Sequence, residues 1–312
     1  MDVSGLDRLQ GSLHVAGAPP RQLRIGRVAA ILSGGNHHPL LCQMEGDDGP
    51  EGNWVVKPQV LLSSSDARRA YFVLSELAAA EVCTWVSVPT PAIGLTRFPE
   101  KLDKRALLAS LASLDNATER EEVVELFALN RGKLAFCSLH LQGGLDVLPG
   151  TFRKRSRKDA LRRTGASIYF LDAFFRNDDR QVGNANLLWM YDELVAIDHG
   201  HAFVGVNHAG TTGATLAGRT VLHSAQGFQS HVLRADLARL PNAAALVEEA
   251  AKRLEAVADA AVEGLLASWP EELDSGIDGE PPRVRILEFL RARRKHCREV
   301  AKNLTGLVSE SR

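Results

Sequence analysis

Residues 177–200 join a polar loop to two short apolar runs, and this stretch constrains the fold of the chain most narrowly. The loop holds Asp179 and, five residues later, Asn184. The apolar runs at 187–191 and 194–197 are separated by a two-residue polar turn, Asp-Glu, which predicts a β-hairpin. Asp198 ends the hairpin, close to a glycine. Because a hairpin returns its far end to its start, we expect Asp179, Asn184 and Asp198 to meet at one edge of a sheet.

Two interpretations of this stretch compete. Asp and Asn are common in surface turns, since they tolerate left-handed backbone and bond their own backbone. The length of the hairpin and the spacing from Asp179 to Asp198 instead favour phosphoryl transfer. In protein kinases an Asp orients the attacking hydroxyl, while an Asn and a second Asp hold Mg²⁺. Arg180 stands beside Asp179 and would keep that carboxylate ionised through its nearby charge.

The composition is that of an ordinary soluble globular protein. The chain has 312 residues, 45% of them hydrophobic and 24% charged, which suffices for two lobes around one cleft or for two ordinary domains. A net charge of −1 argues against a general electrostatic role on nucleic acid or membrane. No apolar run approaches the roughly 20 residues that a membrane helix needs.

Targeting and cysteine patterns favour a reducing, cytoplasmic location. The N-terminal residues lack the basic and apolar regions of a signal peptide. The four cysteines lie far apart, and no Cys-x-x-Cys motif indicates a zinc site or a redox pair. A cytoplasmic protein without disulfides is therefore expected.

The first third of the chain predicts strands around a glycine pair. Residues 25–32 form a β-branched run, residues 39–43 resume extended structure, and Ser-Gly-Gly-Asn at 33–36 separates them. A glycine pair gives backbone N–H groups access to phosphate oxygens, although a plain hairpin turn has the same composition. Residues 46–53 are expected to form a turn-rich surface loop.

A short strand and a helix follow. Residues 54–57 end on Lys57, which is either a solvated strand end or the strand lysine that contacts nucleotide phosphates. Residues 66–83 have helical apolar spacing, with Asp66 as an N-cap. Glu76 lies on or near the buried stripe, where Lys57 is an available partner, or it is a solvated helix residue. Val-Pro-Thr-Pro at 88–91 then predicts a stiff connector, plausible as a hinge.

The rest of the chain is expected to be mainly helical. Apolar spacing predicts helices at 103–130, 159–176, 246–265 and 283–303. The one basic cluster, at 153–163, is interpreted as a solvated face, with a site for an anionic partner as the alternative.

Taken in order, these motifs resemble the HipA-like kinase family, a branch of the protein-kinase-like and phosphoinositide-kinase-like fold. The resemblance covers about residues 22–205 and is most specific at 177–189 and 197–203. The Lys57 strand, the helix with Glu76 and the connector at 88–91 fall where the family places its lysine strand, first large helix and connector.

The resemblance implies an α+β, bilobal protein-kinase-like fold, with a mainly β N-lobe at 1–95 and a helical C-lobe at 96–312. ATP and Mg²⁺ would bind in the cleft. Asp179 would act as the general base, and Asn184 and Asp198 would hold the metal. The remaining implied residues would contact the nucleotide, and they are Ser33, Gly34, Gly35, Asn36, Lys57 and Glu76.

Some features depart from the family or from ordinary protein kinases. Asp178 stands where ordinary kinases have His-Arg, Gln181 where a His is frequent, and His-Gly follows Asp198 in place of Phe-Gly. Toxin-type members carry an extra N-terminal subdomain, whereas about twenty residues precede the first strand here. Neither a toxin function nor an antitoxin partner is therefore carried over to this chain.

Two classes of function remain open at this point. The first is an ATP-dependent phosphotransferase, with a protein Ser or Thr as the favoured acceptor and a small molecule or lipid head group as alternatives. The second is a pseudokinase that binds nucleotide or acts as a scaffold. The intact set of Lys57, Asp179, Asn184 and Asp198 favours the first, because a binding module needs no base.

Overall fold

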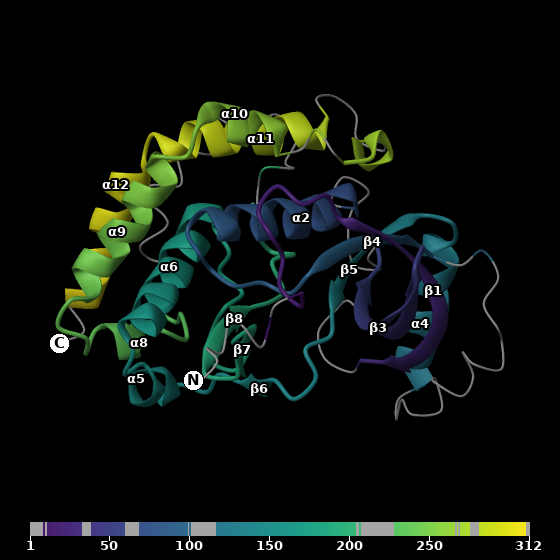
Figure 1. Ribbon diagram of the computed structural model, residues 1–312, viewed down its shortest axis with the longest axis horizontal. Helices are drawn as coiled ribbons and strands as arrows, with labels where there is room; N and C mark the ends of the chain where they lie inside the picture. The colour runs from purple at the N-terminus through teal and green to yellow at the C-terminus, as the bar shows by residue number, and fades with distance from the viewer. Residues whose placement is uncertain are drawn as a thin grey trace.

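The protein has a mixed α+β fold, with a β-barrel at one end and a helical region at the other (Figure 1). The structure is a computed structural model, and it describes residues 9, 11–32, 39–59, 69–98, 100, 117–203, 206, 228–265, 267, 269–274 and 281–309. The strands predicted in the first third of the chain contribute to the barrel, and most of the helices predicted beyond it lie in the helical region.

Five strands close the barrel, in the order β1-β2-β3-β5-β4. Neighbouring strands are antiparallel except β1 and β4, which pair in parallel and complete the closure. The strands are β1 (Arg21–Ile31), β2 (Leu40–Gly46), β3 (Gly49–Lys57), β4 (Ile93–Arg97) and β5 (Leu134–Leu139).

Alternation along the strands fills the barrel. In β2, Leu40, Cys42 and Met44 are buried while the residues between them are more exposed, as expected for a sheet with one apolar face. Trp54 and Val56 of β3 belong to the same buried cluster. Helix α4 (Ala117–Asn130) packs beside the barrel through residues that include Val123.

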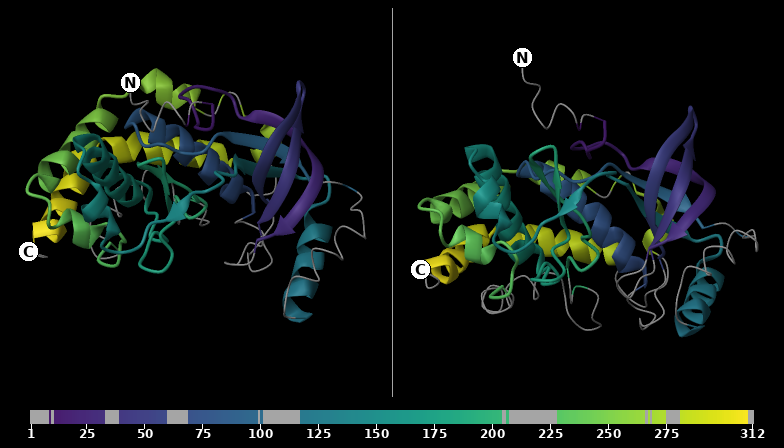
Figure 2. Two further views of the ribbon diagram at one scale, coloured as in Figure 1. Left: turned by 60° about the horizontal axis from the view of Figure 1, so that its bottom comes forward. Right: turned by 90° about the horizontal axis from the view of Figure 1, so that it is seen from below.

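The helical region is built around two long helices. α2 (Arg69–Trp85) runs from the barrel into the helical region, and α6 (Asp159–Phe175) is buried along most of its length (Figure 2). α9 (Ala243–Glu255) and α12 (Cys297–Ser309) cover α6. The remaining helices are α5 (Thr151–Arg155), α8 (Arg234–Leu237), α10 (Asp259–Gly264), the 3₁₀ helix η2 (Glu271–Asp274) and α11 (Pro282–Arg294).

A small sheet contains the predicted hairpin. Strands β7 (Leu187–Met190) and β8 (Glu193–Ala196) pair antiparallel, and β6 (Leu145–Asp146) pairs with β7. The turn consists of Tyr191 and Asp192, one residue earlier than predicted, with φ values of 49° and 66°. Positive φ at both positions is typical of the tight turn that matches strand twist.

Several predicted boundaries were wrong. Residues 49–53, expected as loop, belong to β3. The helix expected at 246–265 is broken into α9 and α10, and the guanidinium of Arg294 donates to the carbonyl oxygens of Glu255 and Val257 at the break. A side chain from α11 thus satisfies carbonyls that a continuous helix would have satisfied itself. The helix expected at 283–303 is likewise two helices, α11 and α12.

Some of the predicted features lie in segments that the structure does not describe. The glycine pair at 33–36, the N-cap Asp66 and residues 103–116 lie outside the described residues. Strand β5, which the sequence analysis did not anticipate, lies beyond residue 95 yet pairs with β3 and β4 inside the barrel. In the described part of the chain, no helix combines the length and apolarity needed to cross a membrane.

Candidate active site

Lys57 lies between two carboxylates. It ends β3, and its Nζ is 2.5 Å from Oε1 of Glu76 on α2 and 2.7 Å from Oδ1 of Asp198 after β8. Lys57 is only 5% exposed and Glu76 only 2%. Of the two alternatives that the sequence analysis left open for Glu76, the structure shows the buried one, paired with Lys57, and Asp198 is a second partner of the lysine.

Electrostatics keep Lys57 charged. Burial by itself would lower the pKa of this lysine, but the negative charges of Asp198 and Glu76 outweigh it and raise the pKa. A buried ammonium ion with two carboxylates around it is stable only because both partners are close. Lys57 is therefore a charged lysine at the end of a barrel strand, balanced by two carboxylates.

The turn after β8 is attached to α2. Glu76 accepts a hydrogen bond from the backbone N–H of His199 at 2.9 Å, and Ser75 donates to the carbonyl oxygen of Ala202 at 3.0 Å. Asp198 has a left-handed backbone, with φ of 54°. A Cβ at Gly200 would lie 1.9 Å from the ring of Phe72, so α2 and this turn approach too closely for any other residue.

Arg180 anchors the polar loop between α6 and the hairpin. Its Nε lies 2.7 Å from Oδ2 of Asp172 on α6, and its Nη1 donates to the carbonyl oxygens of Ile197 and Asn186. The sequence analysis expected Arg180 to keep Asp179 ionised. In the structure the Arg180 guanidinium points inward and pairs with Asp172, a carboxylate of the preceding helix.

Asp179 is held by amide groups. Nδ2 of Asn186 donates to Oδ2 of Asp179 at 2.9 Å, and Nδ2 of Asn184 donates to the Asp179 backbone oxygen at 3.3 Å. The neighbouring Asp178 is exposed, whereas Asp179 is half-buried. The sequence analysis missed Asn186. The sequence signal that could have found it is a second asparagine two residues after Asn184. Asparagine tolerates left-handed backbone, and φ is 47° at Asn186.

The hairpin returns its end to its start, as predicted. The N–H of Ile197, one residue before Asp198, donates to the carbonyl oxygen of Asn186 at 3.0 Å. The structure thus brings Lys57, Glu76 and Asp198 into direct contact and joins them to the loop of Asp179 and Asn184 through the base of the hairpin.

Two buried histidines, His199 and His231, contact residues of α2 and α6. Nε2 of His199 is 3.5 Å from Sγ of Cys83, and Nε2 of His231 is 3.0 Å from Oδ2 of Asp172. Burial, assisted by the nearby charge of Arg180, lowers the pKa of His199 to about 3. Burial also lowers the pKa of His231 in spite of its acidic partner. Both rings are therefore neutral around pH 7.

Asp198 and Asn184, which the sequence analysis expected to hold Mg²⁺, both carry oxygen donors. Among the described residues, no three His, Cys, Asp or Glu side chains form a group able to hold a metal ion by themselves. Mg²⁺ usually binds through one or two carboxylates together with substrate phosphates and water. Asp198, with a side chain 29% exposed, supplies such a carboxylate, and the exposed Asn184 supplies an amide oxygen.

Comparison of the sequence with protein-family models and with curated proteins finds no match. A function is therefore inferred from the side-chain geometry described above.

Proposed function

We propose that this chain is an ATP- and Mg²⁺-dependent phosphotransferase with a bilobal, protein-kinase-like fold, similar to the HipA-like kinases. Its favoured acceptor is a Ser or Thr hydroxyl of a cytoplasmic protein. The contact of Lys57 with both Glu76 and Asp198 is the observation that supports this proposal most strongly. Kinases need a strand lysine positioned by a helix carboxylate, beside an Asp that binds metal.

Each residue of this group has a distinct role in the proposal. Glu76 orients the Lys57 ammonium, which binds phosphate oxygens of ATP. Asn184 and Asp198 hold Mg²⁺, which neutralises the charge that develops on the phosphates. Lys57 and the metal both compete for Asp198, so nucleotide binding is expected to exchange part of the Lys57–Asp198 contact for contacts to phosphate.

Asp179 is proposed to orient the attacking hydroxyl. Its Oδ2 accepts a hydrogen bond from Asn186, which leaves Oδ1 for the proton of the acceptor. Asp179 stands in a loop anchored by the buried Arg180, so its carboxylate is held in place before substrate arrives. Phosphoryl transfer depends mainly on such positioning and on charge stabilisation.

Calorimetry with Asp198→Ala tests the proposal. We expect Mg²⁺-dependent ATP binding to be lost while the circular dichroism spectrum is retained. Asp146→Ala, an exposed carboxylate on β6, is the matched control and should bind as the wild type does. An unchanged affinity of Asp198→Ala for Mg·ATP would refute the metal assignment.

Turnover separates the two classes of function. Transfer of label from [γ-³²P]ATP to a protein acceptor, or to water, is expected for a phosphotransferase. Binding of Mg·ATP without any transfer would identify the chain as a pseudokinase instead.

A further inference from the structure

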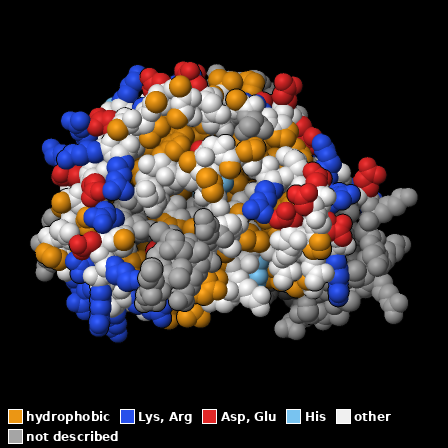
Figure 3. All heavy atoms as spheres, in the orientation of Figure 1, with side chains coloured by type: hydrophobic (Ala, Val, Ile, Leu, Met, Phe, Trp, Pro, Cys, Tyr) orange, Lys and Arg blue, Asp and Glu red, His pale blue; other side chains and the backbone are white. Residues whose placement is uncertain are grey.

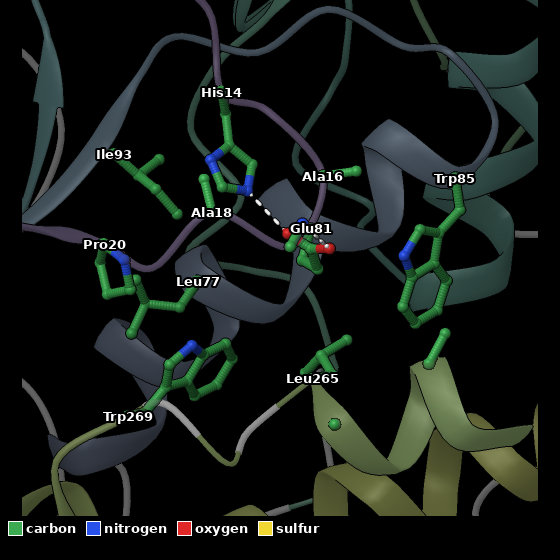
Figure 4. Close-up of a pocket in the computed structure, with 13 residues that line it drawn as sticks. His14, Ala16, Ala18, Pro20, Leu77, Glu81, Trp85, Ile93, Leu265 and Trp269 are labelled. Atoms are coloured by element: carbon green, nitrogen blue, oxygen red, sulfur yellow. Dashed lines mark hydrogen bonds and ion pairs between the residues drawn. The ribbon is translucent and has the colours of Figure 1, made fainter.

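A cavity lies beside α2, and none of the candidate active-site residues lines it. It has a volume of about 420 Å³, within the range of small-molecule sites. Its walls come from residues 14–20, from Leu77, Glu81 and Trp85 of α2, and from the end of α10 (Figure 4). Glu81 follows Glu76 by five residues, so the two carboxylates point roughly 140° apart around α2.

Glu81 is the only acidic side chain among the described residues that line this cavity, and none of those residues is Lys or Arg. Its Oε2 lies 2.8 Å from Nε2 of His14, and its Oε1 accepts the N–H of Gly17 at 2.8 Å. The Glu81 side chain is 13% exposed and that of His14 is 4% exposed. The carboxylate is therefore held in a fixed position in the cavity wall.

The rest of the wall is apolar and aromatic. In Figure 4 the Glu81 carboxylate lies in the middle of the view, with Trp269 to one side and Trp85 to the other, and Leu265 below. Hydrophobic side chains also gather between α2 and the helices α10 and α11 on the face shown in Figure 3. The face of an indole ring attracts cations, and tryptophan does so better than tyrosine or phenylalanine.

We propose that this cavity binds an organic ammonium ion with an apolar body. An anion would meet the Glu81 carboxylate with no described Lys or Arg in the wall to offset the repulsion. A bare metal ion would find a single carboxylate and walls that cannot replace its water shell. An ammonium group beside Glu81 and the indole rings satisfies both the charge and the apolar surface. This binding site is separate from the proposed phosphoryl-transfer site and does not depend on it.

Three probes of one length test the charge preference. They are 4-phenylbutylammonium, 4-phenylbutan-1-ol and 4-phenylbutyrate, which share a body and differ in charge. Calorimetry and ligand-observed NMR with the full chain should show the ammonium ion binding at least about tenfold more tightly than the alcohol, which corresponds to about 1.4 kcal/mol. The carboxylate probe should bind more weakly than the alcohol.

Substitutions then assign the site. Glu81→Gln keeps the shape and the acceptor for Gly17, so the ammonium ion should lose its advantage while the alcohol binds as before. Trp85→Leu should weaken both probes, because it removes one aromatic wall. Glu263→Gln, an exposed carboxylate on α10 outside the cavity, is the matched control and should leave all three affinities unchanged.

Three results would overturn the proposal. They are an alcohol that binds the wild type as tightly as the amine, a charge preference that survives Glu81→Gln in a folded variant, and no detectable binding of any probe at millimolar concentration. Thermal unfolding of each variant establishes that it is folded before binding is compared.

Discussion

At the scale of single residues, the proposed base is positioned by an amide and the lysine by two acids. Asn186 holds one oxygen of Asp179, while the adjacent Arg180 is directed to Asp172. Lys57 is almost completely buried between Glu76 and Asp198. Replacing Asp179 and replacing Lys57 are therefore expected to have different consequences. Asp179 is held by a neutral amide, whereas Lys57 is held by two carboxylates of opposite charge.

Asp179→Asn should reduce turnover by at least about 10²-fold, since loss of a positioned base usually costs about 10²- to 10⁴-fold. Nucleotide affinity should be retained, because an asparagine at this position can still accept the hydrogen bond from Asn186 and so keeps the loop in place. Asp178→Asn, at the exposed neighbour, should lose much less. Steady-state rates with the acceptor at saturation check this, and the reverse order of the two variants would mean that the wrong aspartate was assigned.

Lys57→Met should weaken ATP binding and lower the free energy of unfolding by about 1–3 kcal/mol, since Glu76 would stay buried without its cation. Urea denaturation and calorimetry measure the two effects. Lys154→Met, at an exposed lysine of α5, is the control and should change neither. An unfolding free energy of Lys57→Met equal to that of the wild type would show that the ion pair contributes no net stability.

At the scale of elements, two helices each contain a glycine, one closely packed against a neighbouring helix and the other with open space beside it. Gly165 lies in α6, where an added Cβ would be 2.2 Å from Cζ of Phe152. Phe152 is fully buried and stacks on Trp189 of β7 with ring centroids 6.3 Å apart, so it has little room to move. Gly306 lies in α12, and an added Cβ there meets nothing within 4 Å.

Gly165→Ala should therefore destabilise the protein by about 1–3 kcal/mol through overpacking. Gly306→Ala should stabilise it by roughly 0.5–1 kcal/mol, because alanine loses less backbone freedom in a helix than glycine does. The midpoint and slope of urea unfolding measure both changes. A Gly165→Ala variant at least as stable as the wild type would show that the close approach of α5 to α6 is incorrect.

At the scale of the whole molecule, buried ionisable groups connect segments far apart in the chain. Asp172 of α6 contacts Arg180 of the polar loop and His231 of the segment before α8. His199 lies against Cys83 of α2. Because these groups become solvated only when the molecule unfolds, their protonation is coupled to global stability.

As the pH falls, the protein should lose stability through His199 at pH values above those at which carboxyl groups ordinarily titrate. The folded pKa of about 3 lies below the ordinary value of 6.5, so between these values the unfolded chain binds a proton that the folded chain does not. Stability is therefore lost as the pH falls, by about 2 kcal/mol at pH 5 from this group alone.

Unfolding by urea at pH 7 and at pH 5 measures the effect. The loss of stability between the two values should be smaller in His199→Asn than in the wild type. His296→Asn, whose side chain is 40% exposed in the wild type, serves as control and should behave like the wild type. An equal loss in His199→Asn and the wild type would mean that His199 is not buried as a neutral ring.

Local patterns in the sequence determined the hairpin at 187–196 and the helices α2 and α6, because periodicity and turn residues act over short distances. They made Lys57 an available partner for Glu76 but left open whether Glu76 is paired or solvated, and the tertiary structure decided for the pair. Tertiary structure alone decided that β5 joins the barrel, that Arg294 caps a broken helix, and that Asn186 and not Arg180 holds Asp179. These outcomes depend on which distant segments pack together, and no periodicity records that choice. The cavity at Glu81 has the same origin, since residues 14–20, α2 and α10 form it only after the chain has folded.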